Sequence, residues 1–305
     1  MKVFVTGVNG QLGHDVMLEL YKRGQEAIGS GSGCAYRGED AVGSMKYVQL
    51  DITDGEAVSQ VLSEFRPDAV IHCSAWTAVD AAEEEENREK VFALNVAGPE
   101  NLAKACRMIG AKMVYISTDY VFDGQGTEPW KPDDRNYAPL NVYGESKLQG
   151  ELAVSRNLSD YFIVRTAWVF GVNGKNFIKT MLNLGQKYAS LRVVDDQIGT
   201  PTYTEDLARL LVDMIETEKY GYYHATNEGG YISWCEFAKA IFACAGLPVE
   251  VQPVTTAEYG LSKAKRPFNS RLDKSKLTEN GFRPLPTWQN ALERYCVVIG
   301  AKKNN

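Results

Sequence analysis

The sequence predicts an α/β fold of the Rossmann type, a doubly wound parallel sheet with a smaller mixed α/β lobe at its C-terminal side. Short apolar runs alternate with amphipathic stretches through the first 170 residues, which is typical of a parallel sheet covered by helices on both faces. A glycine-rich turn directly follows the first apolar run. Beyond about residue 170, Gly, Asn and Pro interrupt the alternation more often. We therefore expect a sheet domain over 1–170, with later segments available to cross back into it, and a second lobe over 171–305.

Composition and charge are those of a soluble globular protein. The 305 residues are 44% hydrophobic and 24% charged, enough to bury a sizeable core. The net charge of -6 and the lack of a Lys/Arg run argue against nucleic acid or an anionic membrane as the main partner. The first apolar run is too short for a signal peptide or a membrane span. Six scattered cysteines without a C-x-x-C pair indicate free thiols and no metal site, so we expect cytoplasmic residence.

The first element predicted is a strand over 2–6 that ends in a glycine turn. A dinucleotide's pyrophosphate lies against the backbone and takes N–H groups from a helix N-terminus, where side chains would block it. Gly7 suits the tight turn, Gly10 the close approach and Gly13 the contact between helix and sheet. The structural alternative is three ordinary turn glycines, in a chain with 27 of them. The residues of this turn that we expect to contact a dinucleotide are Gly7, Asn9, Gly10, Gln11, Leu12 and Gly13.

A second strand is predicted over 26–30, followed by a flexible glycine-serine loop where an adenosine ribose would lie. Folds that select NAD usually carry an acidic residue at the end of this strand. Ser30 and, further along, Arg37 stand here instead, which leaves room for a 2′-phosphate and favours NADPH without excluding NADH. After the next strand-like run, Asp51 fits an adenine contact and Ile52 its apolar wall. An Asp in Asp-Ile-Thr-Asp is equally suited to cap a helix.

Two further strands lead to polar segments at their carboxyl ends. The run 69–73 precedes Ser74 and Ala75, at the sheet edge where such folds bind ligands. An acidic run over 83–86 predicts the first turn of a helix that continues to about Gly110. The next strand, over 113–116, ends in Ser-Thr-Asp-Tyr-Val-Phe-Asp.

Tyr143 and Lys147 lie four residues apart, which on a helix places the phenol and the ammonium on one face. A neighbouring cation lowers the pKa of a phenol, so Tyr143 could act as a general acid or base. Tyr259 and Lys263 have the same spacing, and the pattern alone leaves both pairs open. The irregular stretch 124–140 predicts a loop that returns the first pair to the carboxyl edge of the sheet.

The second half contains four predicted helices, over 176–188, 204–216, 234–245 and 288–298. Thr204 is the expected N-cap of the second of these. These helices should form a lobe over the carboxyl edge of the sheet, with a cleft between the two lobes for the substrate. His224 lies in a strand-like run and is read as structural.

Three segments resemble the extended short-chain dehydrogenase/reductase superfamily: TGVNGQLG, YISTDYVFDG and APLNVYGESKLQGE. Within it, the whole chain is similar to the dTDP-4-dehydrorhamnose reductase family. Four later segments extend the resemblance, namely RTAWVFG (165–171), DDQIGTPTYTEDLA (195–208), YISWCEFA (231–238) and RPFNSRLD (266–273). The superfamily's tyrosine lies between the Ser/Thr-bearing strand and another sheet strand. This order selects Tyr143, since Tyr259 lies beyond the sheet.

The resemblance implies a role for each catalytic residue. Tyr143 would protonate the substrate oxygen, and Lys147 would hold the nicotinamide ribose and lower the pKa of the tyrosine. Thr118 would hydrogen-bond the reacting oxygen, and Asn95 would support the helix and a proton relay. Trp168 fits a sugar-nucleotide position and a plain core position equally well. The full set of positions implied to face the sugar nucleotide is Thr77, Val79, Asp119, Tyr120 and Trp168.

The reaction implied is hydride transfer from NADPH to the C4 ketone of dTDP-4-dehydro-L-rhamnose, the last step of dTDP-L-rhamnose synthesis. Related 4,6-dehydratases carry an Asp-Glu pair after the threonine, whereas this chain has Asp119 and Tyr120, which disfavours dehydration. Arg266 and Arg271 are candidates for the diphosphate, since guanidinium groups match phosphate oxygens; two solvated surface arginines are the alternative.

Partners beyond the dTDP-sugar stay open at this point. Some family members carry a magnesium ion at a dimer contact, and no acidic cluster here specifies such a site, so a homodimer and its metal are left open. Two rivals remain: a reductase or epimerase for another nucleotide sugar, and a non-catalytic regulatory subunit such as that of methionine adenosyltransferase.

Overall fold

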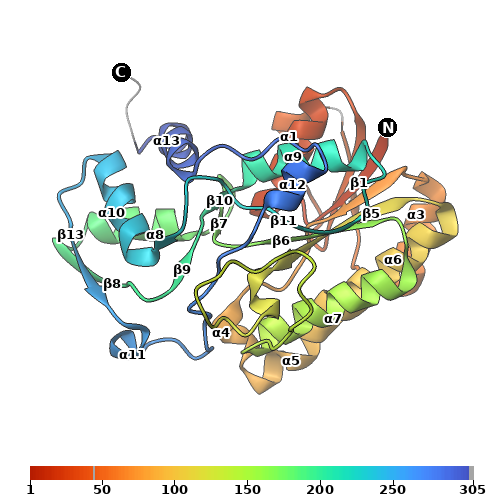
Figure 1. Cartoon of the computed structure of the whole chain (residues 1–305). Coiled ribbons are helices and arrows are strands. Elements are labelled where there is room, and N and C mark those ends of the chain that lie inside the picture. Colours follow the sequence, from red (N-terminus) through yellow and green to blue (C-terminus); the bar gives the residue numbers. More distant parts are fainter. Residues whose placement is uncertain (44, 302–305) are drawn as a thin grey trace.

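A parallel sheet of seven strands forms the centre of the larger lobe in the computed structural model, which describes residues 1–43 and 45–301 (Figure 1). The strand order is β11-β6-β5-β4-β1-β2-β3. The order reverses between β1 and β4, and open α/β sheets bind ligands at the carboxyl ends of the strands beside such a reversal. The strands are β1 Lys2–Thr6, β2 Glu26–Gly31, β3 Lys46–Gln49, β4 Ala69–His72, β5 Lys112–Thr118, β6 Tyr161–Thr166 and β11 Gly221–His224.

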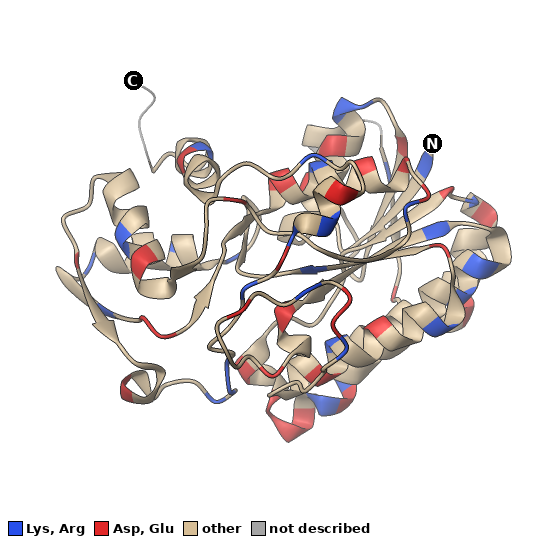
Figure 2. Ribbon diagram, viewed as in Figure 1, with Lys and Arg blue, Asp and Glu red and all other residues tan. Residues whose placement is uncertain are grey.

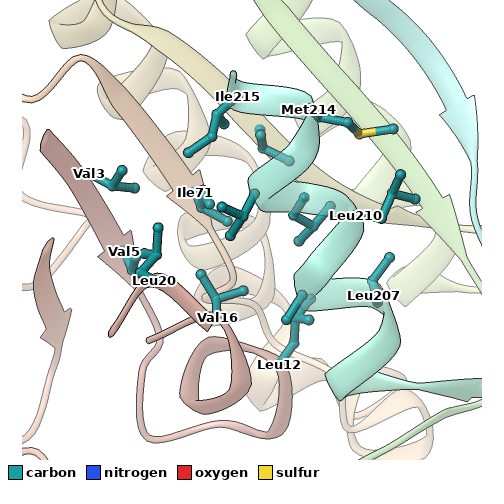
Figure 3. Packing of buried hydrophobic residues seen from close by; sticks show 14 of the residues in the cluster. Val3, Val5, Leu12, Val16, Leu20, Ile71, Leu207, Leu210, Met214 and Ile215 are labelled. Carbon is teal, nitrogen blue, oxygen red and sulfur yellow. The ribbon is translucent and has the colours of Figure 1, made fainter. Parts of the chain in front are cut away.

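Helices cover both faces of this sheet because the side chains of a strand alternate between its two faces. Val3 and Val5 of β1 belong to the core under α1 and α9, whereas Phe4 belongs to the core on the opposite face. Figure 3 shows Val16 of α1 and Leu207 of α9 in the first of these cores. The first layer contains α1 Gln11–Lys22 and α9 Thr204–Ile215, and the second contains α3 Gly55–Phe65, α6 Gly98–Ile109 and α7 Val142–Asn157.

Segments beyond residue 170 contribute to the larger lobe as well as to the smaller one. β11 is the edge strand of the sheet and pairs in parallel with β6. Helix α9 contributes Leu207, Leu210 and Leu211 to the core that it shares with α1. The chain therefore crosses between the lobes more than once (Figure 1).

The smaller lobe has a core of its own, in which Phe170, Phe237 and Leu292 are buried. Strands β8 and β13 pair in parallel on its outer side. Its helices are α8 Phe177–Gly185, α10 Trp234–Ala245, α11 Thr256–Tyr259 and α13 Trp288–Val298. Its strands are β7 Val169–Phe170, β8 Ser190–Val194, β9 Ile198–Gly199, β10 Thr202–Tyr203, β12 Ile232–Ser233 and β13 Glu250–Val254. Short helices elsewhere are α2 Glu39–Val42, α4 Val79–Ala82, α5 Glu85–Phe92 and α12 Ser275–Glu279.

Charged residues of both signs are interspersed along α5, α6 and α7 (Figure 2). The strands of the central sheet carry few of them. No helix within the described part of the chain is both long and apolar enough to cross a membrane.

The helix expected from the acidic run is divided into several pieces. α4 and α5 come first, and the π-helical turn Ala93–Ala97 then joins α5 to α6, which ends at Gly110 in the left-handed conformation. Glu85 and Glu86 occupy the first turn of α5 as expected. Glu83 instead accepts a hydrogen bond from the backbone of Val142, at the start of α7.

The hydrogen bonds confirm one expectation about helix caps, an Asp of the Asp-Ile-Thr-Asp segment, and correct another, Thr204. The Asp that caps α3 is Asp54, whose carboxylate accepts from the backbone of Ala57. Thr204 does not cap α9; its hydroxyl donates to the carboxylate of Asp15 on α1, because the two helices pack together.

Asp15 makes the stability of the fold depend on pH. Burial raises the pKa of its carboxyl to about 6, above the ordinary value. A carboxyl whose pKa is raised on folding contributes stability that is complete below about pH 4 and is lost as the pH rises through about 6. Asp15→Asn keeps an acceptor for Thr204 and should raise the free energy of unfolding at pH 8 by about 1–3 kcal/mol. Denaturant unfolding at pH 5 and pH 8 measures this, and a loss of stability at pH 8 would contradict it.

Candidate functional site

The glycine turn after β1 borders a cavity of about 290 Å³ at the carboxyl edge of the sheet. Gly7 has a φ of +70°, and a Cβ there would lie 2.7 Å from the backbone nitrogen of Ser74. A Cβ on Gly13 would lie 2.3 Å from the carbonyl oxygen of Gly7. A Cβ on Gly10 would meet only that same oxygen, at 3.2 Å, so its remaining side is open to the cavity. The backbone thus provides a cradle that a side chain would fill, which fits a pyrophosphate at the N-terminus of α1.

Asn9 holds the loop after β2 against this turn. Its side-chain amide donates to the carbonyl of Ala35, and its oxygen accepts from the backbone N–H of Arg37. The Arg37 side chain is exposed, and its backbone is held beside Asn9, which lines the cavity. Asp51 and Ile52 line the same cavity.

Ser30 does not line the cavity, contrary to the prediction that it contacts the cofactor. Its side chain is fully buried and its hydroxyl donates to the carbonyl of Val5, 3.3 Å away. Ser32, just beyond the end of β2, lines the cavity instead. The whole lining of this cavity is Gly7, Asn9, Gly10, Gly31, Ser32, Gly33, Leu50, Asp51, Ile52, Cys73, Ser74, Ala75 and Leu94.

A second cavity, of about 490 Å³, shares Gly10 and residues 73–75 with the first and extends between the lobes. It brings together most of the residues predicted from the sequence. Those that line it are Gln11, Leu12, Thr77, Val79, Thr118, Asp119, Tyr120, Tyr143, Lys147 and Trp168.

Tyr143 is placed by the capped start of α7. Asn141 accepts a hydrogen bond from the backbone of Gly144, which sets the first turn. Burial raises the pKa of the Tyr143 phenol, Asp119 adds to this by charge repulsion, and a hydrogen bond with Thr118 opposes it. The pKa of the Tyr143 phenol is therefore raised, opposite to the shift that the sequence predicts. Tyr143 is a protonated phenol at neutral pH.

Lys147 lies one turn further along α7, almost completely buried. Its ammonium is 4.1 Å from the centre of the Tyr115 ring. Burial lowers its pKa to about 7, while Glu151 acts in the opposite direction. Among the described residues the ammonium donates no hydrogen bond to the protein, so its N–H groups are left for a ligand.

Asn95 lies in the π-helical turn and ties α7 to the loop after β4. Its oxygen accepts from the backbone of Trp76 at 2.8 Å, and its amide donates to Ser146 at 2.9 Å. Ser146 in turn donates to the carbonyl of Tyr143. π-helical turns are frequent at functional sites. Asn95 is 1% exposed and lines neither cavity, so its part is to hold the helix in place.

Asp119 is fully buried at the wall of the second cavity. It accepts a hydrogen bond from the Thr118 hydroxyl at 3.0 Å. Burial raises its pKa to about 6. Hydrogen bonds with Ser270 and Thr118 act in the opposite direction on this pKa.

A third cavity, of about 320 Å³, shares Tyr120, Phe177 and Trp234 with the second. Arg266 lines it, with its guanidinium paired to Asp80 at 2.7 Å. Arg271 is not part of it: its guanidinium donates to the side chain of Asn269. The structure thus brings only one of the two predicted arginines to the cleft.

Arg192 and Trp234 line this cavity without having been singled out from the sequence. Both lie in regular elements, where periodicity predicts a strand or a helix and says nothing of a cleft. Trp234 stacks on Trp168 with ring centres 3.7 Å apart. Trp168 has a φ of +51°, rare for a bulky residue, and is half-buried at the cavity wall rather than in the core.

Lys263 forms an ion pair with Glu84, and Tyr259 lines the third cavity. The duplicate Tyr-x-x-x-Lys pair is therefore distant from the glycine turn. Within the described residues, no group of three or more His, Cys, Asp or Glu side chains could hold a metal ion.

A family model described as the RmlD substrate binding domain matches residues 1–299. The chain belongs to this family. The dTDP-4-dehydrorhamnose reductase of Streptomyces griseus is 41% identical over 97% of this chain and 93% of its own length. The spore coat polysaccharide biosynthesis protein SpsK of Bacillus subtilis is 39% identical over 96% of both chains.

A crystal structure of dTDP-4-dehydrorhamnose reductase from Bacillus anthracis in complex with NADP has the same fold. It superposes with a TM-score of 0.87 at 42% identity, covering 97% of this chain and 99% of that one. Membership of the RmlD family makes this chain an oxidoreductase of that family.

The hydrogen bonds of Asn95 should contribute to the stability of the fold. Asn95→Ala removes partners from the partly buried Trp76 backbone and from the buried Ser146 together, so it should cost about 2–4 kcal/mol of unfolding free energy and loosen the start of α7. Ser146→Ala removes the hydrogen bonds of Ser146 to Asn95 and to the Tyr143 carbonyl but leaves the link from Asn95 to Trp76, and it should cost about 1 kcal/mol. Chemical denaturation compares them, and equal costs for the two variants would contradict the bridging role.

Proposed function

We propose that this chain reduces dTDP-4-dehydro-L-rhamnose to dTDP-L-rhamnose with NADPH. The observation that carries this proposal is one cleft in which Thr118, Tyr143 and Lys147 meet beside the glycine turn. The identity to dTDP-4-dehydrorhamnose reductases over nearly the whole chain supports the choice of sugar.

Tyr143 supplies the proton in this proposal. Its phenol keeps its proton at neutral pH because burial and Asp119 disfavour the phenolate. Reduction of a ketone creates an alkoxide, and a neutral acid in contact with it can protonate it as the charge develops. Thr118, hydrogen-bonded to Tyr143, is in place to hold the same oxygen. The Lys147 ammonium favours the negative charge that Tyr143 acquires on giving up its proton.

The nicotinamide dinucleotide would lie along the first cavity, with its pyrophosphate on the turn from Gly7 to Gly13 and its ribose on Lys147. When bound, it supplies the hydride that reaches the ketone carbon. The exposed Arg37 favours a 2′-phosphate, and β2 ends without an acidic residue. The NADP in the related Bacillus anthracis structure supports the same choice.

The nucleotide part of the substrate fits the third cavity. Phe177 and Trp234 offer flat apolar surfaces for a thymine ring, and Arg266 and Arg192 offer cationic groups for the diphosphate. Since Trp234 lines both the second and the third cavity, a substrate bound at both would pass beside it. Asp119 and Tyr120 would then face the sugar.

Purified protein should oxidise NADPH only when dTDP-4-dehydrorhamnose is generated in the same reaction, with dTDP-L-rhamnose as product. NADH should support a slower reaction at equal concentration, because the end of β2 carries no acidic residue that would accept a hydrogen bond from a free 2′-hydroxyl. Absorbance at the NADPH band and chromatography of the product check this. A faster reaction with a UDP- or GDP-ketosugar would contradict the substrate assignment. Absence of turnover from folded, NADPH-binding protein would favour a regulatory subunit.

Tyr143→Phe should lower turnover by about 100-fold or more, since general acid catalysis contributes that order of rate. NADPH binding should be nearly unchanged, because the ring remains. Steady-state kinetics and a fluorescence titration of NADPH measure the two effects. Tyr188→Phe removes a hydroxyl from an exposed tyrosine on the smaller lobe and is the matched control. A near wild-type rate for Tyr143→Phe would show that another group donates the proton.

A further inference from the structure

A buried ion pair lies one helical turn beyond Lys147. Glu151 of α7 faces Arg165 of β6 through two hydrogen bonds of 2.8 Å, one to each carboxylate oxygen. Both side chains are 0% exposed. Burying two charges costs several kcal/mol per ion, so such pairs are weak stabilisers compared with well-packed apolar residues. Stability alone therefore does not account for a buried pair of Glu151 and Arg165.

The guanidinium of Arg165 is held from several sides. Besides Glu151, it donates to the hydroxyl of Tyr137 at 2.8 Å and to the carbonyl of Pro132 at 3.2 Å. His224 approaches it at 3.5 Å. Because Arg165 is fixed in this way, its bidentate grip fixes the carboxylate of Glu151 too.

Glu151 and Lys147 are four residues apart on α7, so their side chains share one face of the helix. Lys147 is thus next to a carboxylate whose position the sheet determines. The same carboxylate is paired with a second buried cation, Arg165. Glu151 is therefore one anion that interacts with two buried cations, Lys147 and Arg165.

The other titratable groups that face Lys147 are uncharged at neutral pH. From the end of β4, burial lowers the pKa of His72 to about 3 and raises that of Cys73 to about 12. From β5 and α7, burial raises the pKa of the phenols of Tyr115 and Tyr143. Within the described residues, Glu151 is accordingly the anion that faces the ammonium. Without it, the same buried space would hold two cations and no anion.

We propose that Glu151, clamped by Arg165, is a positioning residue that keeps Lys147 in its ammonium form, ready to donate hydrogen bonds to the cofactor. This inference rests on the proposed function, in which Lys147 holds the nicotinamide ribose. Glu151 touches neither cavity and acts only through Lys147.

The first test is the pH dependence of NADPH binding to full-length Glu151→Gln, measured by fluorescence titration without any sugar. Removing the anion lowers the pKa of Lys147 further, so the pH at which binding weakens should move to lower pH by about one unit or more. At about pH 7.5 the variant should bind about five- to tenfold more weakly than wild type, and near pH 5.5 the two should approach each other. The same factor of loss at every pH, or no loss at all, would overturn the proposal.

Two further variants separate charge from structure. Glu151→Gln/Arg165→Met removes both charges together, so that no unpaired charge is buried, and it should show a shift in the same direction. Tyr137→Phe removes a hydrogen bond from Arg165 but no charge, and should keep the wild-type pH profile. A wild-type profile in the folded double variant would overturn the proposal. So would a shift of equal size in Tyr137→Phe.

A second readout needs no cofactor. Lys147 has a folded pKa near 7, lower than the unfolded value near 10.4, so the free energy of unfolding should rise with pH between these two values. In Glu151→Gln that rise should begin at lower pH. Urea unfolding at a series of pH values measures it, and an unchanged onset would overturn the proposal even if the protein bound no NADPH. If the protein does not reduce the proposed sugar but Glu151→Gln shifts both the pH profile of NADPH binding and that of unfolding, the substrate assignment is wrong and the role of Glu151 stands.

Discussion

The close approach of helix α7 to strand β5 is the contact on which the site depends. A Cβ at Gly150 would lie 2.2 Å from the hydroxyl of Tyr115 and 2.3 Å from the carbonyl oxygen of Asn95. The helix axis can therefore come this near only because Gly150 has no side chain. The ammonium of Lys147 reaches the face of the Tyr115 ring as a result, and the phenol of Tyr143 reaches the strand end that carries Thr118. The positions of Tyr143 and Lys147 in the cleft thus depend on the close packing of α7 at Gly150.

Burial gives the groups of the cleft protonation states that they would not have in water. It raises the pKa of the Tyr143 phenol and of the Asp119 carboxyl, and lowers that of the Lys147 ammonium. Each shift disfavours the charged form of its group. A reductase gains from this because its acid must be neutral before the hydride arrives. Negative charge that develops in the cleft would lie near the buried ammonium of Lys147.

Much of this architecture could be predicted from the sequence because its signals are local. The strand, glycine turn and helix over 2–22 and the spacing of Tyr143 and Lys147 are read from a few neighbouring residues. The location of Ser30, Arg271 and Trp234 could not be obtained in the same way. Their environments are made by segments distant in sequence, such as Val5 for Ser30 and Trp168 for Trp234. The predicted direction of the pKa shift at Tyr143 was wrong for the same reason. The spacing along the sequence reveals the neighbouring lysine, but the burial that raises the pKa of the phenol depends on the whole fold.

The return of α9 and β11 to the larger lobe also affects how the chain folds during synthesis. The first 170 residues contain six of the seven sheet strands and the helix α1. The apolar side chains that α1 presents beside α9, such as Val16 and Leu20 (Figure 3), lack their cover until residues 204–215 have been made. The edge of β6 likewise stays open until residues 221–224 have left the ribosome. A nascent chain that pauses before this point exposes both an apolar helix face and an unpaired strand edge, the two surfaces that chaperones and aggregation partners recognise.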